Sequence, residues 1–246
     1  MALALFGPPT YLSDSAAAGS QADRRRRPRV RQPRVAHYSQ VLAGGNGSCA
    51  YRAIKRLFDI VGASLLIIAF SPVLVLVYLA LLVTTRGQPI FRQKRVGQCG
   101  RLFTLYKFRT MVVNAEAIKS QICNEQDGPV FKNRRDPRVT RLGALLRKFS
   151  IDELPQLFNV LRGDMSLVGP RPPVESEVLK YEDWQLRRLA VKPGLTCLWQ
   201  VSGRCEIGFT QWVRMDLWYI DRQSLLLDLV LLAKTPASVI SGRGAY

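Results

Sequence analysis

The sequence predicts an α+β protein that is mainly helical and carries a membrane helix near its N-terminus. Two observations lead to this fold class. The 26 residues of Ile60–Thr85 contain no charge, and they are followed by a β-prone hairpin pattern and then by amphipathic helical patterns. A length of 246 residues leaves room for one ordinary domain plus appended segments. We therefore divide the chain into residues 1–50, 51–86 and 87–246.

The composition indicates an anionic partner. A formal net charge of +18 suits nucleic acid, a phospholipid surface or a phosphorylated substrate. Five cysteines without a C-x-x-C spacing and a single histidine, His37, argue against a zinc site and are typical of reduced thiols in a cytosolic compartment. The apolar start, residues 1–6, precedes the arginines, which is the wrong order for a signal peptide.

Residues 1–50 are expected to form a disordered basic arm. They are rich in Ala, Ser, Gly, Pro and Arg, hold seven arginines between residues 24 and 34, and show no apolar periodicity. Such an arm could be a solubilising tail, or it could lie on anionic lipid headgroups, where each basic residue contributes on the order of 1 kcal/mol. The apolar segment that follows favours the lipid interpretation.

Residues 51–86 are expected to form a membrane helix of one of two topologies. A helix over Ile60–Thr85 is long enough to span a hydrocarbon core of roughly 30 Å. Two features favour a re-entrant helix instead. Both flanks are basic, against the usual asymmetry, and Ser71-Pro72 lies near the middle, where Pro72 cannot donate to the carbonyl of Ile68 and the Ser71 hydroxyl can bond back. Proline is also tolerated in spanning helices, so both topologies stay open.

The next segments predict a small β-hairpin and short helices. Ile90–Val96 and Leu102–Phe108 are β-prone and flank a turn at residues 97–100, so they should pair, with basic side chains projecting from both strands. Residues 114–135 indicate a helix fragment followed by a loop, and Arg141–Lys148 indicates a short basic helix. Further on, residues 216–220 and 225–232 predict amphipathic helices. Trp212 just before them, with Trp218 and Tyr219, belongs either to the core or to an interfacial face.

The acidic pair Asp152-Glu153 lies in a strongly basic setting. Residues 86–148 hold fifteen Lys or Arg against four Asp or Glu, a local net charge of +11. Asp152 suits an N-cap, Pro155 suits the first turn, and apolar residues then recur at helical spacing up to Gly163; they are Leu154, Leu157, Phe158 and Leu161. Ser150-x-x-Glu153 also matches a capping box, so helix capping alone could explain the pair.

The surroundings of this pair favour chemistry on a phosphate. A helix N-terminus attracts anions, and Arg147 and Arg171 offer guanidinium groups that fit phosphate. Arg171 lies in a proline-flanked turn in which Gly169 permits an unusual backbone angle. One carboxylate could then ligate Mg²⁺ while the other acts as a base or nucleophile. The residues therefore predict a membrane-associated, metal-assisted phosphoryl-transfer site.

Several long motifs resemble the bacterial sugar transferase family, the monotopic phosphoglycosyl transferases, over about Arg52–Tyr246. The motifs are Lys107–Met111, Asp136–Thr140, Leu146–Asn159, Gly163–Pro172, Lys192–Thr196 and Ser241–Tyr246. The resemblance implies transfer of a sugar 1-phosphate from a UDP-sugar to undecaprenyl phosphate with release of UMP, the first membrane step of exopolysaccharide, capsule or O-antigen synthesis. The short form of the chain is similar to galactose or glucose phosphotransferases of this kind.

The resemblance also implies roles for individual residues. Asp152 would be the nucleophile that forms an aspartyl-phosphosugar, Glu153 would hold Mg²⁺, Arg147 would contact phosphate, and Arg171 between Pro170 and Pro172 would help place the nucleotide. Ser71-Pro72 would break the membrane helix, so a re-entrant topology becomes the preferred one. Further candidates for phosphate or headgroup contact are Lys94, Arg95, Lys107 and Arg109.

The implied location is the bacterial inner membrane, with residues 87–246 as a catalytic domain on the cytoplasmic face and phospholipids as partners. One position departs from the family pattern, because Cys197 stands where the family usually has Gly, and it would strain the turn if that position needs a positive φ. The alternatives are a membrane-anchored basic protein that binds nucleic acid or anionic lipid, and an inactive scaffold of polysaccharide assembly. No specific nucleic acid is expected, and the sequence leaves open both the sugar and whether the chain forms a homo-oligomer.

Overall fold

The computed structural model describes residues 48–118, 122–125, 128–131, 133, 135–202 and 207–241. The expected basic arm lies outside these residues except for its last three. Within them the chain is mainly helical with two small sheets, which confirms the mainly helical α+β class.

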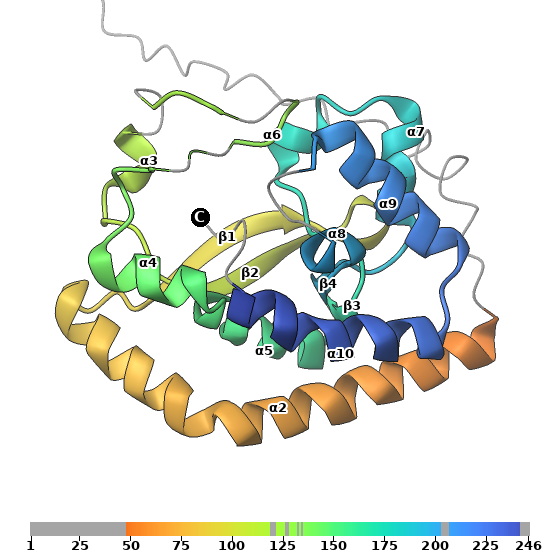
Figure 1. Cartoon of the computed structure of the whole chain (residues 1–246), viewed down its shortest axis with the longest axis horizontal. Helices are drawn as coiled ribbons and strands as arrows, with labels where there is room; N and C mark the ends of the chain where they lie inside the picture. Colours follow the sequence, from red (N-terminus) through yellow and green to blue (C-terminus); the bar gives the residue numbers. More distant parts are fainter. Residues whose placement is uncertain are drawn as a thin grey trace, which may run out of the picture. The chain divides into compact units, whose positions relative to one another are not determined.

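The apolar segment forms one long helix, α2, from Cys49 to Thr84. It begins at Ser48, whose Oγ accepts a hydrogen bond from the backbone N–H of Tyr51 at 3.1 Å. The predicted contact at Ser71 is present, since its Oγ donates to the carbonyl of Ile68 at 2.8 Å, and Pro72 follows inside the helix. Figure 1 shows α2 as a broad arc with both ends rising toward the other elements. By length and composition α2 is the one helix among the described residues that could cross a membrane.

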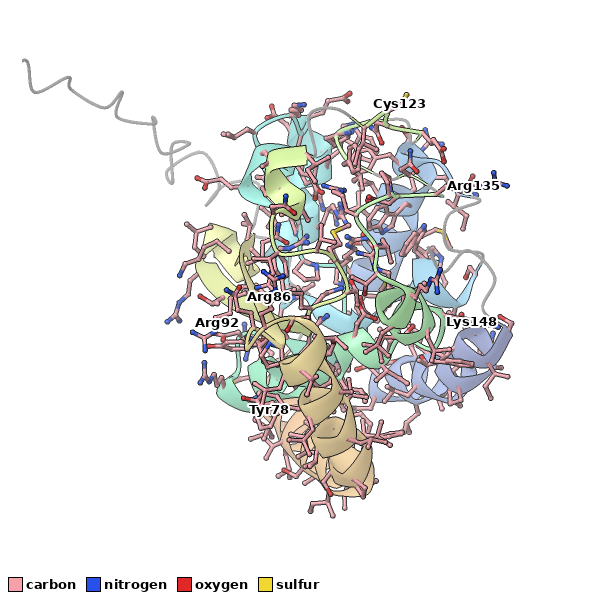
Figure 2. The ribbon with its side chains drawn as sticks, turned by 90° about the vertical axis from the view of Figure 1, so that its left-hand side faces the viewer. Tyr78, Arg86, Arg92, Cys123, Arg135 and Lys148 are labelled. Carbon is pink, nitrogen blue, oxygen red and sulfur yellow. The ribbon has the colours of Figure 1, made fainter. Side chains whose placement is uncertain are left out.

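The two arms of α2 pack on different elements. In the N-terminal arm, the Leu167 side chain lies where a Cβ on Gly62 would be, and Ala63 is part of the main core cluster. The small residues at these two positions let α2 pack closely on the rest of the protein. Near the C-terminal end, Leu81 packs in a cluster with Phe108 and Leu146. Most other large apolar side chains of α2 remain exposed, as expected for a helix whose partner is lipid. Figure 2 shows Tyr78 low on this helix, with Arg86 and Arg92 above it.

The hairpin has the predicted bounds. Strands β1 (Ile90–Val96) and β2 (Leu102–Phe108) pair antiparallel, with Ile90 opposite Phe108 and Val96 opposite Leu102. The turn between them is a short 3-10 helix, η1 (Gln98–Gly100), in which Cys99 has a positive φ of 53°. Phe103, Leu105 and Phe108 of β2 are buried, so this strand faces the core.

A second sheet was not predicted. Strands β3 (Ser166–Val168) and β4 (Gly194–Thr196) pair in parallel and have three residues each, too few for an alternating pattern to show. Gly169, directly after β3, lies against Gly194, the first residue of β4, and a Cβ on either would collide with the backbone of the other segment. The expectation that Gly169 supplies an unusual φ was therefore wrong, because its φ lies outside the left-handed region and close approach of two backbones is what requires glycine.

The predicted short basic helix is confirmed as α4 (Arg141–Lys148), and the fragment near residue 114 as α3 (Ala115–Ile118). The two predicted C-terminal helices lie inside the longer α9 (Phe209–Asp221) and α10 (Leu225–Ser241). Other helices among the described residues are α6 (Glu175–Val178), α7 (Asp183–Leu186), the 3-10 helix η4 (Arg187–Ala190) and α8 (Leu198–Val201). Trp212 and Tyr219 are core residues, whereas Trp218 is 42% exposed, so an interfacial position suits only the last.

The acidic pair lies in a 3-10 helix, η3 (Ile151–Gln156), that continues into α5 (Leu157–Arg162) and ends at Gly163, as predicted. The predicted capping was wrong. The chain reverses directly after α4 through Ser150 in the left-handed conformation (φ 53°), and its side chain makes no capping bond. Asp152 is accordingly the second residue of η3 and not an N-cap. Phe158, predicted on the apolar face, is 46% exposed.

Candidate active site

A cleft of about 380 Å³ opens between the hairpin, α4, η3 and the turn after β3. Eight of the predicted site residues line it: Arg95, Lys107, Arg109, Arg147, Asp152, Glu153, Arg171 and Pro172. Lys94 is exposed and Pro170 is buried, and neither is part of this lining. The structure thus brings together residues from four separate segments of the sequence.

Lys107 joins the acidic pair to the end of β2. Its Nζ lies 2.6 Å from Oε1 of Glu153 and 3.9 Å from Oδ2 of Asp152. The first distance is a charge-assisted hydrogen bond, and the second is too long for one. Glu153 therefore holds the lysine, while Asp152 feels its charge without being bonded to it.

Asp152 is only 7% exposed. Burial raises the pKa of this carboxyl to about 6, and the neighbouring Glu153 carboxylate adds to the rise, while Lys107 and Arg147 oppose it. At neutral pH the group is mostly ionised but poorly solvated. A carboxylate in this state is a better nucleophile than one covered by water.

Arg147 reaches the cleft from the last turn of α4, and a hydrogen bond fixes its guanidinium. Its Nε donates to Oγ1 of the buried Thr110 at 2.9 Å, which leaves the two terminal guanidinium nitrogens for another ligand. Thr110 is itself fixed, because its carbonyl accepts bonds from the N–H and hydroxyl of Thr140, the residue that caps α4. Gly143 of α4 presses on the same carbonyl, where a Cβ would collide.

Arg171 is presented by a turn that β1 supports. Nη1 of the buried Arg95 donates to the carbonyl of Pro172 at 2.9 Å, and the N–H of Val96 donates to the carbonyl of Pro173 at 2.9 Å. Burial, followed by the charge of Arg171, lowers the pKa of Arg95 to about 10. Arg95 thus supports the turn from inside the protein.

The Arg171 guanidinium lies 5.8 Å from the ring centroid of Trp212, within reach of a cation–π interaction. Trp212 stacks on Trp199 with centroids 4.4 Å apart. Arg188 also lies over Trp212, at 4.9 Å, and forms a buried ion pair with Asp216 at 2.6 Å. A rigid aromatic wall therefore stands behind Arg171.

Arg109 is turned toward the start of the hairpin. Its Nε donates to the carbonyl of Gln88 at 2.8 Å, and its guanidinium lies 6.0 Å from the Phe91 ring centroid. It still lines the cleft, so a phosphate or headgroup contact stays a prediction for Arg109 as it does for Lys94.

Sequence reasoning missed several residues that shape the cleft. Thr110 lies in a recognised motif but 37 positions before Arg147, so only folding reveals their contact. Arg138 is buried and grips Asp136 through two bonds of 2.9 and 2.7 Å, which lowers the pKa of Asp136. The Asp136-x-Arg138 spacing was visible in the sequence, but not its place beside Arg147.

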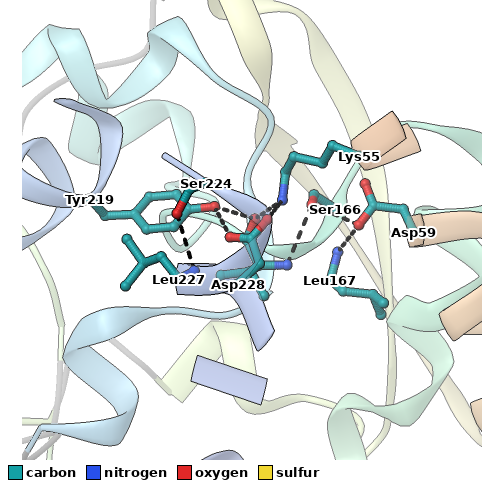
Figure 3. Close-up of polar contacts among 9 residues, drawn as sticks. Lys55, Asp59, Ser166, Leu167, Tyr219, Ser224, Leu227 and Asp228 are labelled. Atoms are coloured by element: carbon teal, nitrogen blue, oxygen red, sulfur yellow. Dashed lines mark hydrogen bonds and ion pairs between the residues drawn. The ribbon is translucent and has the colours of Figure 1, made fainter. Parts of the chain in front are cut away.

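A second missed group fastens α2 to the strand that leads to Arg171 (Figure 3). Nζ of Lys55 bonds Oδ2 of Asp228 at 2.6 Å and the carbonyl of Val168 at 3.2 Å. The Tyr219 hydroxyl donates to Oδ1 of Asp228 at 2.7 Å. One helical turn further along α2, Oδ1 of Asp59 accepts bonds from the hydroxyl of Ser166 and the N–H of Leu167, both at 2.9 Å. Five polar residues thus tie the first turns of α2 to β3.

Cys197 fits its position without strain. Its φ is −146°, in the extended region that any residue adopts, and it precedes α8 as a buried thiol. The strain expected for a position that needs positive φ does not arise.

No group of three or more His, Cys, Asp or Glu side chains suited to a metal ion occurs among the residues that the structure describes. The acidic pair offers two carboxylates side by side. Because Mg²⁺ is commonly bound through one or two carboxylates plus phosphate oxygens and water, this donor set fits the ion only if a phosphate substrate completes it.

These features define a class: a membrane-helix protein with a cationic cleft built around the buried Asp152 and its half-buried neighbour Glu153. The chain belongs to the bacterial sugar transferase family, whose sequence profile matches residues 50–242.

Individual relatives have more specific names. The undecaprenyl-phosphate galactose phosphotransferase of Salmonella typhimurium is 46% identical over 202 residues, which cover 79% of this chain and 42% of the relative. The UDP-galactose-lipid carrier transferase of Erwinia amylovora is 43% identical over 203 residues, again 79% and 42%. The exopolysaccharide production protein ExoY of Rhizobium meliloti is 39% identical over 198 residues, which cover 78% of this chain and 88% of the relative. The chain therefore spans about two fifths of the length of the first two relatives and most of the third.

Proposed function

We propose that this protein transfers a sugar 1-phosphate from a UDP-sugar to undecaprenyl phosphate and so begins the membrane stage of exopolysaccharide, capsule or O-antigen synthesis. The observation that carries the proposal is the buried Asp152, whose carboxylate lies among Lys107, Arg147 and Glu153 in a cleft beside a membrane helix. The names of the relatives support both the sugar phosphate and the lipid acceptor.

The proposed reaction has two displacements at one phosphorus. An oxygen of Asp152 attacks the β-phosphorus of the UDP-sugar, and the bond from that phosphorus to the bridging oxygen breaks, so UMP leaves with the oxygen. A phosphate oxygen of undecaprenyl phosphate then attacks the same phosphorus and releases the Asp152 carboxylate. No net proton is needed for either bond exchange, because an anion replaces an anion at each step.

The cations of the cleft serve this chemistry by neutralising phosphate oxygens. Phosphoryl transfer demands charge stabilisation more than covalent assistance. Arg147 offers the two nitrogens that Thr110 leaves unused, and Arg171 approaches from the opposite turn. Mg²⁺, held by Glu153 and phosphate oxygens, would supply further neutralisation when bound. Lys107 would then exchange part of its contact with Glu153 for phosphate.

We further propose that α2 is re-entrant in the bacterial inner membrane, so that both of its ends and the catalytic domain lie on the cytoplasmic face. The arc of α2, the Ser71 bond and Pro72 support this topology, as do the basic residues at both ends. The long acceptor chain stays in the bilayer, so the cleft must lie near headgroup height.

The function is tested with one pair of variants. Wild type, Asp152→Asn and the matched control Asp183→Asn, an exposed aspartate of α7 outside the cleft lining, are incubated with undecaprenyl phosphate, magnesium and a panel of UDP-sugars, and UMP is followed. Asp152→Asn should lose on the order of 10⁴-fold or more in turnover, and the control should not change. Without acceptor, a donor labelled in its β-phosphate should label wild type and the Asp183→Asn control but not Asp152→Asn. Turnover by Asp152→Asn at the wild-type rate would refute the nucleophile.

Topology is tested by labelling single cysteines in intact cells with a membrane-impermeant maleimide. The exposed Cys49 marks one end of α2, and a cysteine introduced by Arg86→Cys marks the other. A re-entrant helix protects both until the membrane is permeabilised. Labelling of either one in intact cells would contradict re-entry.

A further inference from the structure

The outer face of α9 carries a shallow groove that is separate from the active-site cleft. It encloses about 430 Å³ and shares no lining residue with the cleft. The groove is lined by Trp184, Arg187, Arg214, Leu217, Trp218, Asp221 and Arg222. Three arginines against one aspartate give it a surplus of positive charge, and two indoles give it flat apolar walls.

The side chains of this groove are partly fixed. The Arg222 guanidinium lies 4.9 Å from the ring centroid of Trp218. Arg187 bonds Asp221 at 2.6 Å across the groove, and Nε1 of Trp184 donates to Glu182 at 2.6 Å. Arg214 is exposed and has no ion pair with the described acidic residues. Part of the cationic charge is therefore free for a ligand.

The groove ends where the protein meets its membrane helix. Arg222 closes α9, and α10 begins three residues later at Leu225. The first turn of α10 exposes Leu226 by 73%, while Asp228 of the same helix bonds Lys55 near the start of α2. Figure 1 shows the end of α9 running down to α10 beside the first turns of α2. Beyond the end of the groove, exposed apolar side chains are thus present both at the start of α10 and on α2.

We propose that this groove binds the headgroup of an anionic phospholipid. The arginines would contact the phosphate and the anionic headgroup, and the indoles would sit at the level where Trp is typical of membrane interfaces. The acyl chains would run over Leu226 toward the exposed apolar side chains of α2. Charge complementarity favours an anionic lipid over a zwitterionic one. Each arginine near an anionic surface should raise the affinity for it roughly fivefold.

The test uses the full chain in nanodiscs with its own tryptophan fluorescence. Trp199 and Trp212 are buried, so the groove tryptophans report contact with lipid. Phosphatidylglycerol or phosphatidylcholine with brominated acyl chains is added at equal mole fraction. Brominated phosphatidylglycerol should quench wild type more strongly, and Trp218→Phe should lose most of this difference.

Two double variants distinguish a specific headgroup site from general electrostatic attraction to an anionic membrane. The two brominated lipids should quench Arg214→Gln/Arg222→Gln equally. The control Arg101→Gln/Lys180→Gln removes the same charge from exposed positions outside the groove, and it should keep the preference for phosphatidylglycerol. Unchanged quenching by brominated phosphatidylcholine shows that the variant still folds and inserts. Three results would each overturn the proposal. They are equal quenching of wild type by the two lipids, a preference for phosphatidylglycerol that survives in Arg214→Gln/Arg222→Gln, and a loss of that preference in the control. No donor or acceptor is present, so the result is independent of the transfer reaction.

Discussion

Two buried aspartates of this protein each lie beside a lysine, yet their surroundings differ. Asp228 is fully buried and its two oxygens are bonded by Lys55 and Tyr219 at 2.6 and 2.7 Å. Asp152 is nearly as buried, but Lys107 stays 3.9 Å away and bonds Glu153 instead. Burial raises the pKa of both carboxyls. The difference teaches that hydrogen bonds from two side chains make the buried carboxylate of Asp228 structural, whereas the carboxylate of Asp152, which accepts no side-chain hydrogen bond from its lysine, stays available for reaction.

The largest effect is expected for a substitution of Asp152, which should lower activity while raising stability. Its pKa of about 6 in the folded protein exceeds its ordinary 3.8, so folding favours the protonated form, and this contribution to stability is lost as pH rises through about 6. Asp152→Asn should therefore abolish turnover while raising the free energy of unfolding at pH 7 by roughly 2–3 kcal/mol. Denaturant unfolding in detergent at pH 7 and at pH 4 measures this, and the gain should vanish at pH 4. A variant that is less stable than wild type at pH 7 would break the comparison.

Asp228→Leu should show the opposite pattern. It removes the oxygens that accept from the partly buried Lys55 and the buried Tyr219 hydroxyl, and the free energy of unfolding should fall by about 3 kcal/mol because an unpaired buried charge is costly. Lys55→Met/Asp228→Leu should recover most of that loss, since it removes both charges. Unfolding and UMP release are measured together. Full stability with no turnover in Asp228→Leu would show that Asp228 is not structural.

The charge of Lys107 should set the pH at which the enzyme becomes active. Lys107 lowers the pKa of Asp152, so Lys107→Met should raise it and shift the acid limb of the kcat/KM profile upward by roughly one unit. Wild type should gain activity as pH rises through about 6, because Asp152, the proposed nucleophile, must be ionised. The control Arg101→Met alters an exposed position outside the cleft lining and should keep the wild-type profile. A profile for Lys107→Met that overlays wild type would contradict an influence of this charge on Asp152.

A smaller effect should follow at Thr110, whose bond orients Arg147. Thr110→Val keeps the shape of the side chain but loses the acceptor for Nε, and kcat/KM for the UDP-sugar should fall about tenfold, in line with the loss of a hydrogen bond to a charged group. Thr110→Ser keeps the hydroxyl and should retain most of the activity. If valine and serine behave alike, Thr110 acts through packing alone.

Local patterns predicted those elements whose determinants are local. The hairpin and α4 were correct to the residue because alternation and a glycine turn, or a basic amphipathic run, specify them directly. The capping of Asp152 was wrong because the left-handed Ser150 is set by the reversal between α4 and η3, which is a tertiary constraint. Three-residue strands such as β3 carry no period to detect.

The same limit applies to the cleft. Asp152, Glu153, Arg147 and Arg171 could be chosen because their residue types suit phosphate and because the motifs resemble a family. The partners that hold them, Thr110 and Arg95 among others, are ordinary residues until the fold brings them within bonding distance. Residue type alone is equally uninformative for Trp212 and Trp218, which lie six positions apart in α9. Trp212 is buried in the core, whereas Trp218 is exposed.

The two arms of α2 hold opposite walls of the cleft. The first arm bonds β3, which leads to Arg171, and the second packs through Leu81 on Phe108 and Leu146, with Ile151 beside them, next to Arg147 and Asp152. Ser71 and Pro72 lie between these two arms, within one continuous helix. A change in the bend of α2 at this point would therefore move the wall that carries Arg171 relative to the wall that carries Arg147 and Asp152.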